Sequence, residues 1–243
     1  MLDARTEQSL AQFTQQLCQL LGDDLVAVAL YGSAAGTNFV PGSSDFNTAI
    51  VVQEMRFEIL QKLQSRMVDW HQIGFAVPLV IDREFLQRSR DVFPMEFYDI
   101  QEQHRLLWGE DVFHALIIDT RYLRFLAEHE ARSRLLRLQA LYFERARDPE
   151  RLRQILLDSL KTFLTIMRHL IRLQGKSGPQ NYAEVLTQFE QYFQLSFPRM
   201  RQLIAIRLGT AEWPNESIID FFRDYLADVQ RLVKLIDRLP PKD

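Results

Sequence analysis

The sequence predicts an α+β fold in which an N-terminal domain with a mixed β-sheet is followed by an all-helical bundle. Two short apolar runs rich in Val and Leu, residues 25–31 and 48–52, indicate buried strands in the first half. From about residue 120 onward, apolar residues recur at helical spacing and no convincing strand pattern appears. The charge also changes sign: residues 1–112 carry 8 Lys/Arg and 16 Asp/Glu, whereas residues 113–243 carry 21 and 16. These observations predict two domains, 1–112 and 113–243.

The N-terminal half alternates between helical and strand periodicity. The predicted elements are a helix at 7–21, strands at 25–31 and 48–52, a helix at 54–72 and a strand at 75–81. Pro78 favours an edge position or a bulge for the third strand, because proline cannot donate a ladder hydrogen bond. Strands interspersed with helices in this order are typical of a mixed α and β domain.

The C-terminal half is expected to contain helices only. A long helix should begin at Asp148, because an N-cap Asp followed by proline at the first helical position is a strong start signal, and it should end at Gly175. Asn215 is expected to cap the last helix, whose apolar residues form one stripe. The other helices are expected at 120–146, near 181–194 and near 198–208.

Composition excludes several classes of protein. A net charge of −3 gives no general affinity for nucleic acid or an anionic membrane, so neither is an expected partner. The single cysteine, Cys18, excludes an internal disulfide and a cysteine-based zinc cluster. No apolar run approaches the roughly 18 residues that indicate a membrane span, and the polar N-terminus has no apolar segment of a signal peptide. We therefore expect a cytoplasmic protein.

The clearest chemical pattern lies in the stretch 30–52. Gly-Ser at 32–33 follows one predicted strand, and Ser-Asp-Phe-Asn at 44–47 leads into the next. A Gly-Ser turn lets backbone N–H groups approach phosphate oxygens, and the serine adds a hydroxyl group. Acids at positions i and i+2 of a strand point to the same face, where they can hold a hard cation such as Mg²⁺. Moving a nucleotide from a triphosphate to an acceptor needs both features.

This arrangement resembles the nucleotidyltransferase fold of the polymerase-beta-like superfamily, whose signature is Gly-Ser followed by Asp-x-Asp at the start of the next strand. The resemblance covers about residues 8–82 and is carried by Gly32, Ser33, Asp45 and Asn47. The second half is similar to the C-terminal bundle of aminoglycoside nucleotidyltransferases and their bacterial relatives. The resemblance implies Mg²⁺-dependent transfer of a nucleotide from ATP or another NTP to an unknown small-molecule or protein acceptor.

The resemblance also implies roles for individual residues. Gly32, Ser33 and Ser44 would hold phosphate, and Asp45 would bind the metal and take part in catalysis. Asn47 stands where the family has its second metal-binding Asp, so one metal ligand is an uncharged amide.

The family's third carboxylate comes from a later strand, here 75–81, which contains no acid. Asp82 follows directly and is a third metal ligand only if the strand runs one residue further. The alternative is that Asp82 caps the helix beginning near Arg83, a common role for Asp.

The degenerate acidic motif leaves two functions open. One is a working nucleotidyltransferase with a weakened metal site. The other is a catalytically inactive nucleotide-binding or protein-interaction module on the same scaffold. The third interpretation is structural: residues 30–52 would be ordinary turn residues between strands. The long amphipathic helices and the opposite charges of the two halves are compatible with a homodimer.

Two further segments have chemical interest. Glu96 is a candidate general base if a cleft between the domains holds the acceptor, and His104 is a second candidate. The alternative is that the acids near Glu96 face water while the aromatic residues around them pack, and that His104 lies at a surface or interface. The arginine-rich stretch 130–153 is interrupted by acids, so a solvated helix face with i,i+4 ion pairs is expected rather than a nucleic-acid site.

Overall fold

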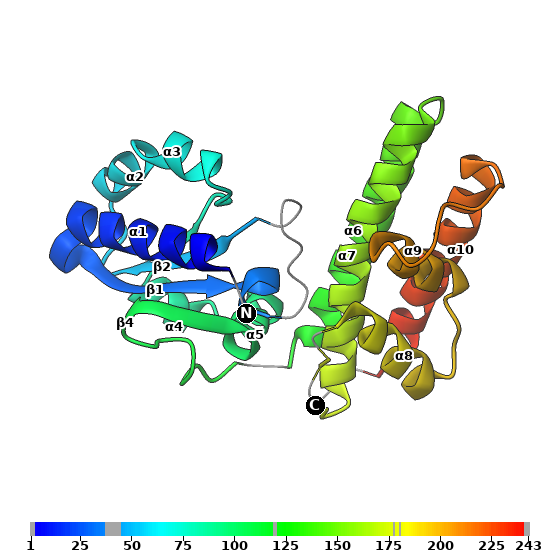
Figure 1. Cartoon of the computed structure of the whole chain (residues 1–243). Helices are drawn as coiled ribbons and strands as arrows, with labels where there is room; N and C mark the ends of the chain where they lie inside the picture. Colours follow the sequence, from blue (N-terminus) through cyan, green and yellow to red (C-terminus); the bar gives the residue numbers. More distant parts are fainter. Residues whose placement is uncertain (1–2, 37–44, 119–120, 177, 180, 241–243) are drawn as a thin grey trace. The chain divides into compact units, whose positions relative to one another are not determined.

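The computed structural model describes residues 3–36, 45–118, 121–176, 178–179 and 181–240. Its contacts divide the chain into two compact units, residues 1–119 and 120–243. The first unit extends past residue 112 because Phe113 is fully buried in the core under the sheet. Each unit is described by itself (Figure 1).

The first unit is built on a four-stranded mixed sheet in the order β3-β2-β1-β4. The strands are β1 (Leu25–Tyr31), β2 (Asn47–Val52), β3 (Leu79–Asp82) and β4 (His104–Gly109). Strand β1 is antiparallel to both β2 and β4, and β2 is parallel to β3. The two apolar runs found in the sequence are therefore adjacent central strands, and the predicted α+β fold class is confirmed.

Helices cover both faces of this sheet (Figure 1). One face packs against α1 (Ala4–Leu21), α2 (Phe57–Gln64) and α3 (Met67–Gln72); the other packs against α4 (Arg83–Arg88) and α5 (Pro94–Glu102). Side chains of β2 alternate between the two cores: Ile50 and Val52 pack on the first face, Ala49 and Val51 on the second. A strand buried on both faces explains why its sequence is a continuous apolar run.

Four elements of this unit differ from the sequence prediction. The helix expected at 54–72 is two helices, α2 and α3, and the Ser65 hydroxyl donates to the carbonyl of Lys62 (2.6 Å) where α2 ends. Such a bond offers the backbone an alternative to continuing the helix. Strand β3 is shorter than expected, and Phe75 forms only an isolated bridge with Phe46. Helix α5 and the edge strand β4 were not predicted.

The second unit is all-helical in its described residues, as predicted. Its helices are α6 (Leu123–Arg145), α7 (Pro149–Leu173), α8 (Tyr182–Phe193), α9 (Pro198–Arg207) and α10 (Ile218–Arg238). Asp148 caps α7 as predicted, accepting from the Arg151 backbone N–H at 3.0 Å. The prediction for the last helix is corrected: Ser217, not Asn215, is its N-cap and accepts from the Ile219 backbone N–H.

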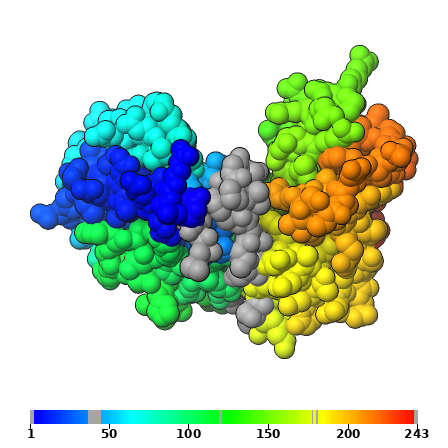
Figure 2. Space-filling model, viewed as in Figure 1, coloured from blue at the N-terminus to red at the C-terminus, as the bar shows by residue number. Residues whose placement is uncertain are grey.

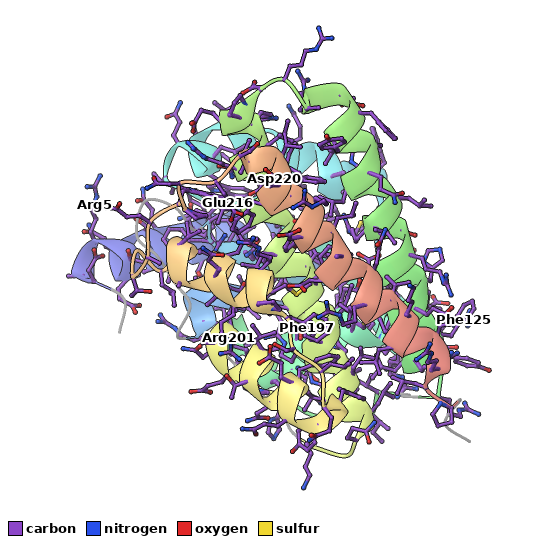
Figure 3. The ribbon with its side chains drawn as sticks, turned by 90° about the vertical axis from the view of Figure 1, so that its right-hand side faces the viewer. Arg5, Phe125, Phe197, Arg201, Glu216 and Asp220 are labelled. Atoms are coloured by element: carbon purple, nitrogen blue, oxygen red, sulfur yellow. The ribbon has the colours of Figure 1, made fainter. Side chains whose placement is uncertain are left out.

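Buried polar side chains fix the helices of this unit to one another. Asp228 of α10 is 1% exposed and accepts from the backbone N–H groups of Arg199 (2.9 Å) and Met200 (3.3 Å) at the start of α9. Figure 3 shows Arg201 on α9, Glu216 just before α10 and Asp220 in the first turn of α10. In the part of the chain that the structure describes, no helix has the length and apolarity that a membrane crossing requires.

Candidate functional site

The Gly-Ser pair lies at the end of strand β1, in the 3-10 turn η2 (Gly32–Ala35). Gly32 has φ 73°, a left-handed backbone conformation that glycine adopts without the steric cost of a Cβ. The β1–β2 register pairs Tyr31 with Asn47, so the turn lies opposite the first residue of β2. A Cβ built on Gly32 would lie 3.4 Å from Asn47 Nδ2. The two halves of the motif therefore meet at one end of the central strand pair.

The side chains of Asp45 and Asn47 are directed to the same face of the sheet. Phe46, between them, is buried in the core under α1, and its ring lies 5.3 Å from that of Phe75. Its backbone is fixed on both sides, donating to the Gly74 carbonyl (2.9 Å) and accepting from the Ala76 N–H (3.1 Å). Because side chains alternate along an extended chain, Asp45 and Asn47 point away from that core. Asp45 is exposed and Asn47 is partly buried.

Helix α5 brings a carboxylate to this same face. Phe97 and Ile100 of α5 pack with Ala49 of β2, and Tyr31 is partly buried against this cluster. Burial raises the pKa of the Tyr31 hydroxyl, and the negative charge of Glu96 raises it further. Glu96 is therefore within electrostatic reach of Tyr31, the residue that precedes Gly32 and pairs with Asn47.

The turn also has a contact that the sequence did not indicate. A Cβ built on Gly36 would fall 1.3 Å from Gln103 Nε2, so this side chain packs directly on the residue that follows η2. Gln103 is the C-cap of α5. The only sequence signals for Tyr31 and Gln103 are their positions next to Gly32 and to the segment of Glu96.

Asp82 is not brought to Asp45 and Asn47. It pairs with Val52 at the other end of β2, about 16 Å from Asn47 at roughly 3.3 Å per residue. Its carboxylate accepts from the backbone N–H groups of Phe85 (2.7 Å) and Met55 (2.9 Å). Asp82 is thus the N-cap of α4, the alternative that its sequence context offered.

His104 has a structural place beside the site. It pairs with Tyr31 across β1 and β4, and its side chain is 7% exposed. Nδ1 donates to the Ile100 carbonyl (2.8 Å), and Nε2 lies 3.0 Å from Asp111 Oδ1. Burial opposes ionisation of Asp111, but the His114 backbone N–H and the His104 ring outweigh it and lower the pKa of Asp111. Both ring nitrogens are therefore engaged, which leaves His104 no free nitrogen to act as a base.

The donor set at this end of the sheet suits a magnesium ion shared with a substrate. Mg²⁺ in phosphate-transfer sites is commonly held by one or two protein oxygens together with phosphate oxygens and water. Asp45 and Asn47 supply a carboxylate and an amide oxygen on one face, next to the Gly32 turn. The described residues contain no group of three His, Cys, Asp or Glu placed to hold a metal alone. Ser44, expected to contact phosphate, lies outside the described residues.

Comparisons with known proteins bear on the fold. No protein-family model and no curated protein matches this sequence. Among solved structures, the chain is similar to the spectinomycin adenyltransferase AAD(9) from Enterococcus faecialis, crystallised with ATP and spectinomycin. The TM-score is 0.59 at 12% identity, covering 92% of this chain and 99% of that chain. The similarity confirms the expected fold over nearly the whole length.

Proposed function

We propose that this chain, which has the fold of an aminoglycoside nucleotidyltransferase, binds a nucleoside triphosphate with Mg²⁺ and transfers its nucleotide to an acceptor. The observation that carries the proposal is the β1–β2 register, which sets the Gly32 turn opposite Asn47, two residues after Asp45. ATP is the first candidate nucleotide, because the adenyltransferase of similar fold was crystallised with it. The acceptor is a small molecule or a protein.

The residues have distinct roles in this proposal. Gly32 and Ser33 hold phosphate oxygens through backbone N–H groups and the serine hydroxyl, and Ser44 is assigned the same role. Asp45 and Asn47 hold Mg²⁺, which would neutralise phosphate charge and orient the triphosphate. Because an amide oxygen is neutral, the protein contributes one negative charge fewer than an Asp-x-Asp pair.

Glu96 is proposed as the general base, on the strength of its position near Tyr31. A carboxylate there can take the proton of an acceptor hydroxyl as the hydroxyl oxygen attacks the α-phosphorus and pyrophosphate leaves. Tyr31, half-buried between Glu96 and Asn47, is proposed to position this carboxylate. The pKa of Tyr31 is raised, so its hydroxyl keeps its proton and acts as a hydrogen-bond donor.

The second candidate function is a catalytically inactive nucleotide-binding or protein-interaction module on the same scaffold. It is favoured by Asn47 and by the position of Asp82, which leaves Asp45 as the one acid of the expected metal set at this end of the sheet. Such a module binds nucleotide with little dependence on Mg²⁺, or does not bind nucleotide at all.

Calorimetric titration of ATP, with Mg²⁺ and with chelator, separates these functions. The variants are Asp45→Ala and, as a matched control, Asp82→Ala, which removes an acid from the opposite end of the same sheet. The proposal expects Mg²⁺-dependent binding that Asp45→Ala abolishes and Asp82→Ala retains. Binding that is unaffected by Asp45→Ala would contradict the site, and absence of binding in the wild type would favour the interaction module. Pyrophosphate release with candidate acceptors then tests catalysis.

A further inference from the structure

Helices α6 and α7 line an open hollow whose lining residues all belong to the helical unit. It has a volume of about 410 Å³, within the roughly 300–1,000 Å³ of small-molecule sites. Its apolar lining includes Leu138 and Ile155, and Ser159 and Thr162 add hydroxyl groups. Figure 2 shows that the connected ends of α6 and α7 project from the rest of the helical unit into solvent.

Four arginines line this hollow: two from the middle of α6, one from the end of α6 and one from the first turn of α7. They are Arg134, Arg137, Arg145 and Arg151. Two acids, Glu144 and Asp158, also line it, so the lining is net positive. Asp158 accepts from the Gln154 side chain at 2.8 Å.

Several arginines of these helices have acidic partners: Arg124 and Arg132 contact Glu128, and Arg153 contacts Glu150. Arg134, at the edge of the hollow, is paired with Glu130 at 2.7 Å.

Arg137, Arg145 and Arg151 differ, because no ion pair joins them to any acid among the described residues. The expected i,i+4 pairing therefore accounts for Arg124, Arg132 and Arg134 but not for these three arginines. Their guanidinium groups come from two helices and border one cavity, which a solvated face does not require.

We propose that this hollow is a binding site for a phosphorylated small molecule, with Arg137, Arg145 and Arg151 as its anion contacts. Guanidinium groups match phosphate oxygens in bidentate geometry, and they remain charged at any physiological pH. The apolar lining and the hydroxyls would accommodate the part of the ligand that carries no phosphate. The volume suits a ligand of nucleotide size rather than a polymer.

This site shares no residue with the one proposed for nucleotide transfer. Its residues lie in the helical unit, whereas Gly32, Asp45 and Asn47 lie in the other unit. A test must therefore remove any contribution of the first site.

The probe is inorganic pyrophosphate, titrated by calorimetry in chelator against the full chain carrying Asp45→Ala. Three Arg→Gln changes at positions 137, 145 and 151 remove the guanidinium groups and their charge while keeping a polar side chain. The matched control changes Arg207, Lys234 and Arg238 to Gln, three exposed basic residues outside the hollow, so both variants lose the same charge. Thermal melts verify that each variant folds, and Arg137→Gln alone replaces the triple variant if that variant unfolds.

We expect the triple Arg→Gln variant of the hollow to bind pyrophosphate about a hundredfold more weakly than the parent, which corresponds to the loss of roughly two charge-assisted hydrogen bonds. The control variant should stay within about threefold, the screened effect of distant surface charge. Equal weakening in both variants, or no pyrophosphate binding at millimolar concentration, would overturn it. Binding of a single-stranded oligonucleotide in place of pyrophosphate would overturn it too, because the partner would then be a polymer.

Discussion

Replacing Gly32 with alanine separates the backbone strain at the candidate phosphate turn from its role in binding. At φ 73° the left-handed conformation destabilises an alanine by about 1–2 kcal/mol. The lower conformational entropy of the unfolded alanine chain offsets up to about 1 kcal/mol of this loss. The new Cβ would lie 3.4 Å from Asn47 Nδ2, at the edge of ordinary contact, so no further steric cost is expected. The net loss of unfolding free energy should be about 1 kcal/mol, or a melting temperature about 2–4 °C lower.

Gly209 provides the matched control, because it has φ 70° and a Cβ there would meet nothing within 4 Å. Gly32→Ala and Gly209→Ala should therefore lower the melting temperature by similar amounts. Only Gly32→Ala should weaken ATP binding, by tenfold or about 1.4 kcal/mol, because its methyl group occupies the space between the turn and Asn47. Thermal melts and ATP calorimetry on both variants measure the two effects. Unchanged ATP affinity in Gly32→Ala, with binding intact in the wild type, would refute the assignment of this turn to phosphate.

Three further predictions test the metal-binding position, the packing of the helical unit and the loss of stability at acidic pH. Asn47→Asp should slightly lower the melting temperature in chelator, because two carboxylates then repel, and should gain more than wild type from Mg²⁺ plus ATP; equal shifts would show that residue 47 does not face a metal. Asp228→Ala should lower the urea-unfolding free energy by about 2 kcal/mol, since it orphans two N–H groups at the start of α9, whereas a loss below about 0.5 kcal/mol, the range of neutral surface changes, would contradict this. The pKa of Asp111 is lower in the folded protein than its unfolded value near 3.8, so ionised Asp111 stabilises the fold above pH 3.8, and this stabilisation is lost as pH falls through the folded pKa. The difference in unfolding free energy between wild type and Asp111→Asn should therefore become smaller as pH is lowered from 7 to 3, as measured by urea unfolding.

The parts of the fold that the sequence predicts are those with local, strong signals. Strands β1 and β2 are buried on both faces, so their sequences are apolar without interruption. Asp148 and its following proline mark a helix start without any tertiary information. By contrast, β4 is an edge strand that contains His104, Arg105 and Trp108 and pairs with β1 alone. Its extended conformation comes from that pairing, which the local sequence does not encode.

Some residues of the candidate site are also predictable from local sequence patterns, whereas others are not. Gly32, Asp45 and Asn47 are recognisable because a turn and an i,i+2 pair are local patterns. Tyr31 and Gln103 depend on the β1–β2 register and on how α5 packs, and both are properties of the folded unit. Asp82 shows the converse case: a suitable residue next to a suitable strand lies at the wrong end, because β3 runs parallel to β2.

The proposed site has few acids for two functions, metal binding and proton transfer. Holding magnesium with two protein carboxylates and deprotonating an acceptor requires three acids, whereas the described part of this end of the sheet offers Asp45 and Glu96. If Glu96 reaches the metal, it compensates for the neutral Asn47 but no longer serves as the base. If Glu96 remains the base beside Tyr31, the metal is held by one carboxylate and relies on the triphosphate for most of its negative ligands. In that second case the ion binds only together with the nucleotide. Asn47 would then make metal occupancy depend on the substrate that binds at the proposed phosphate turn of Gly32.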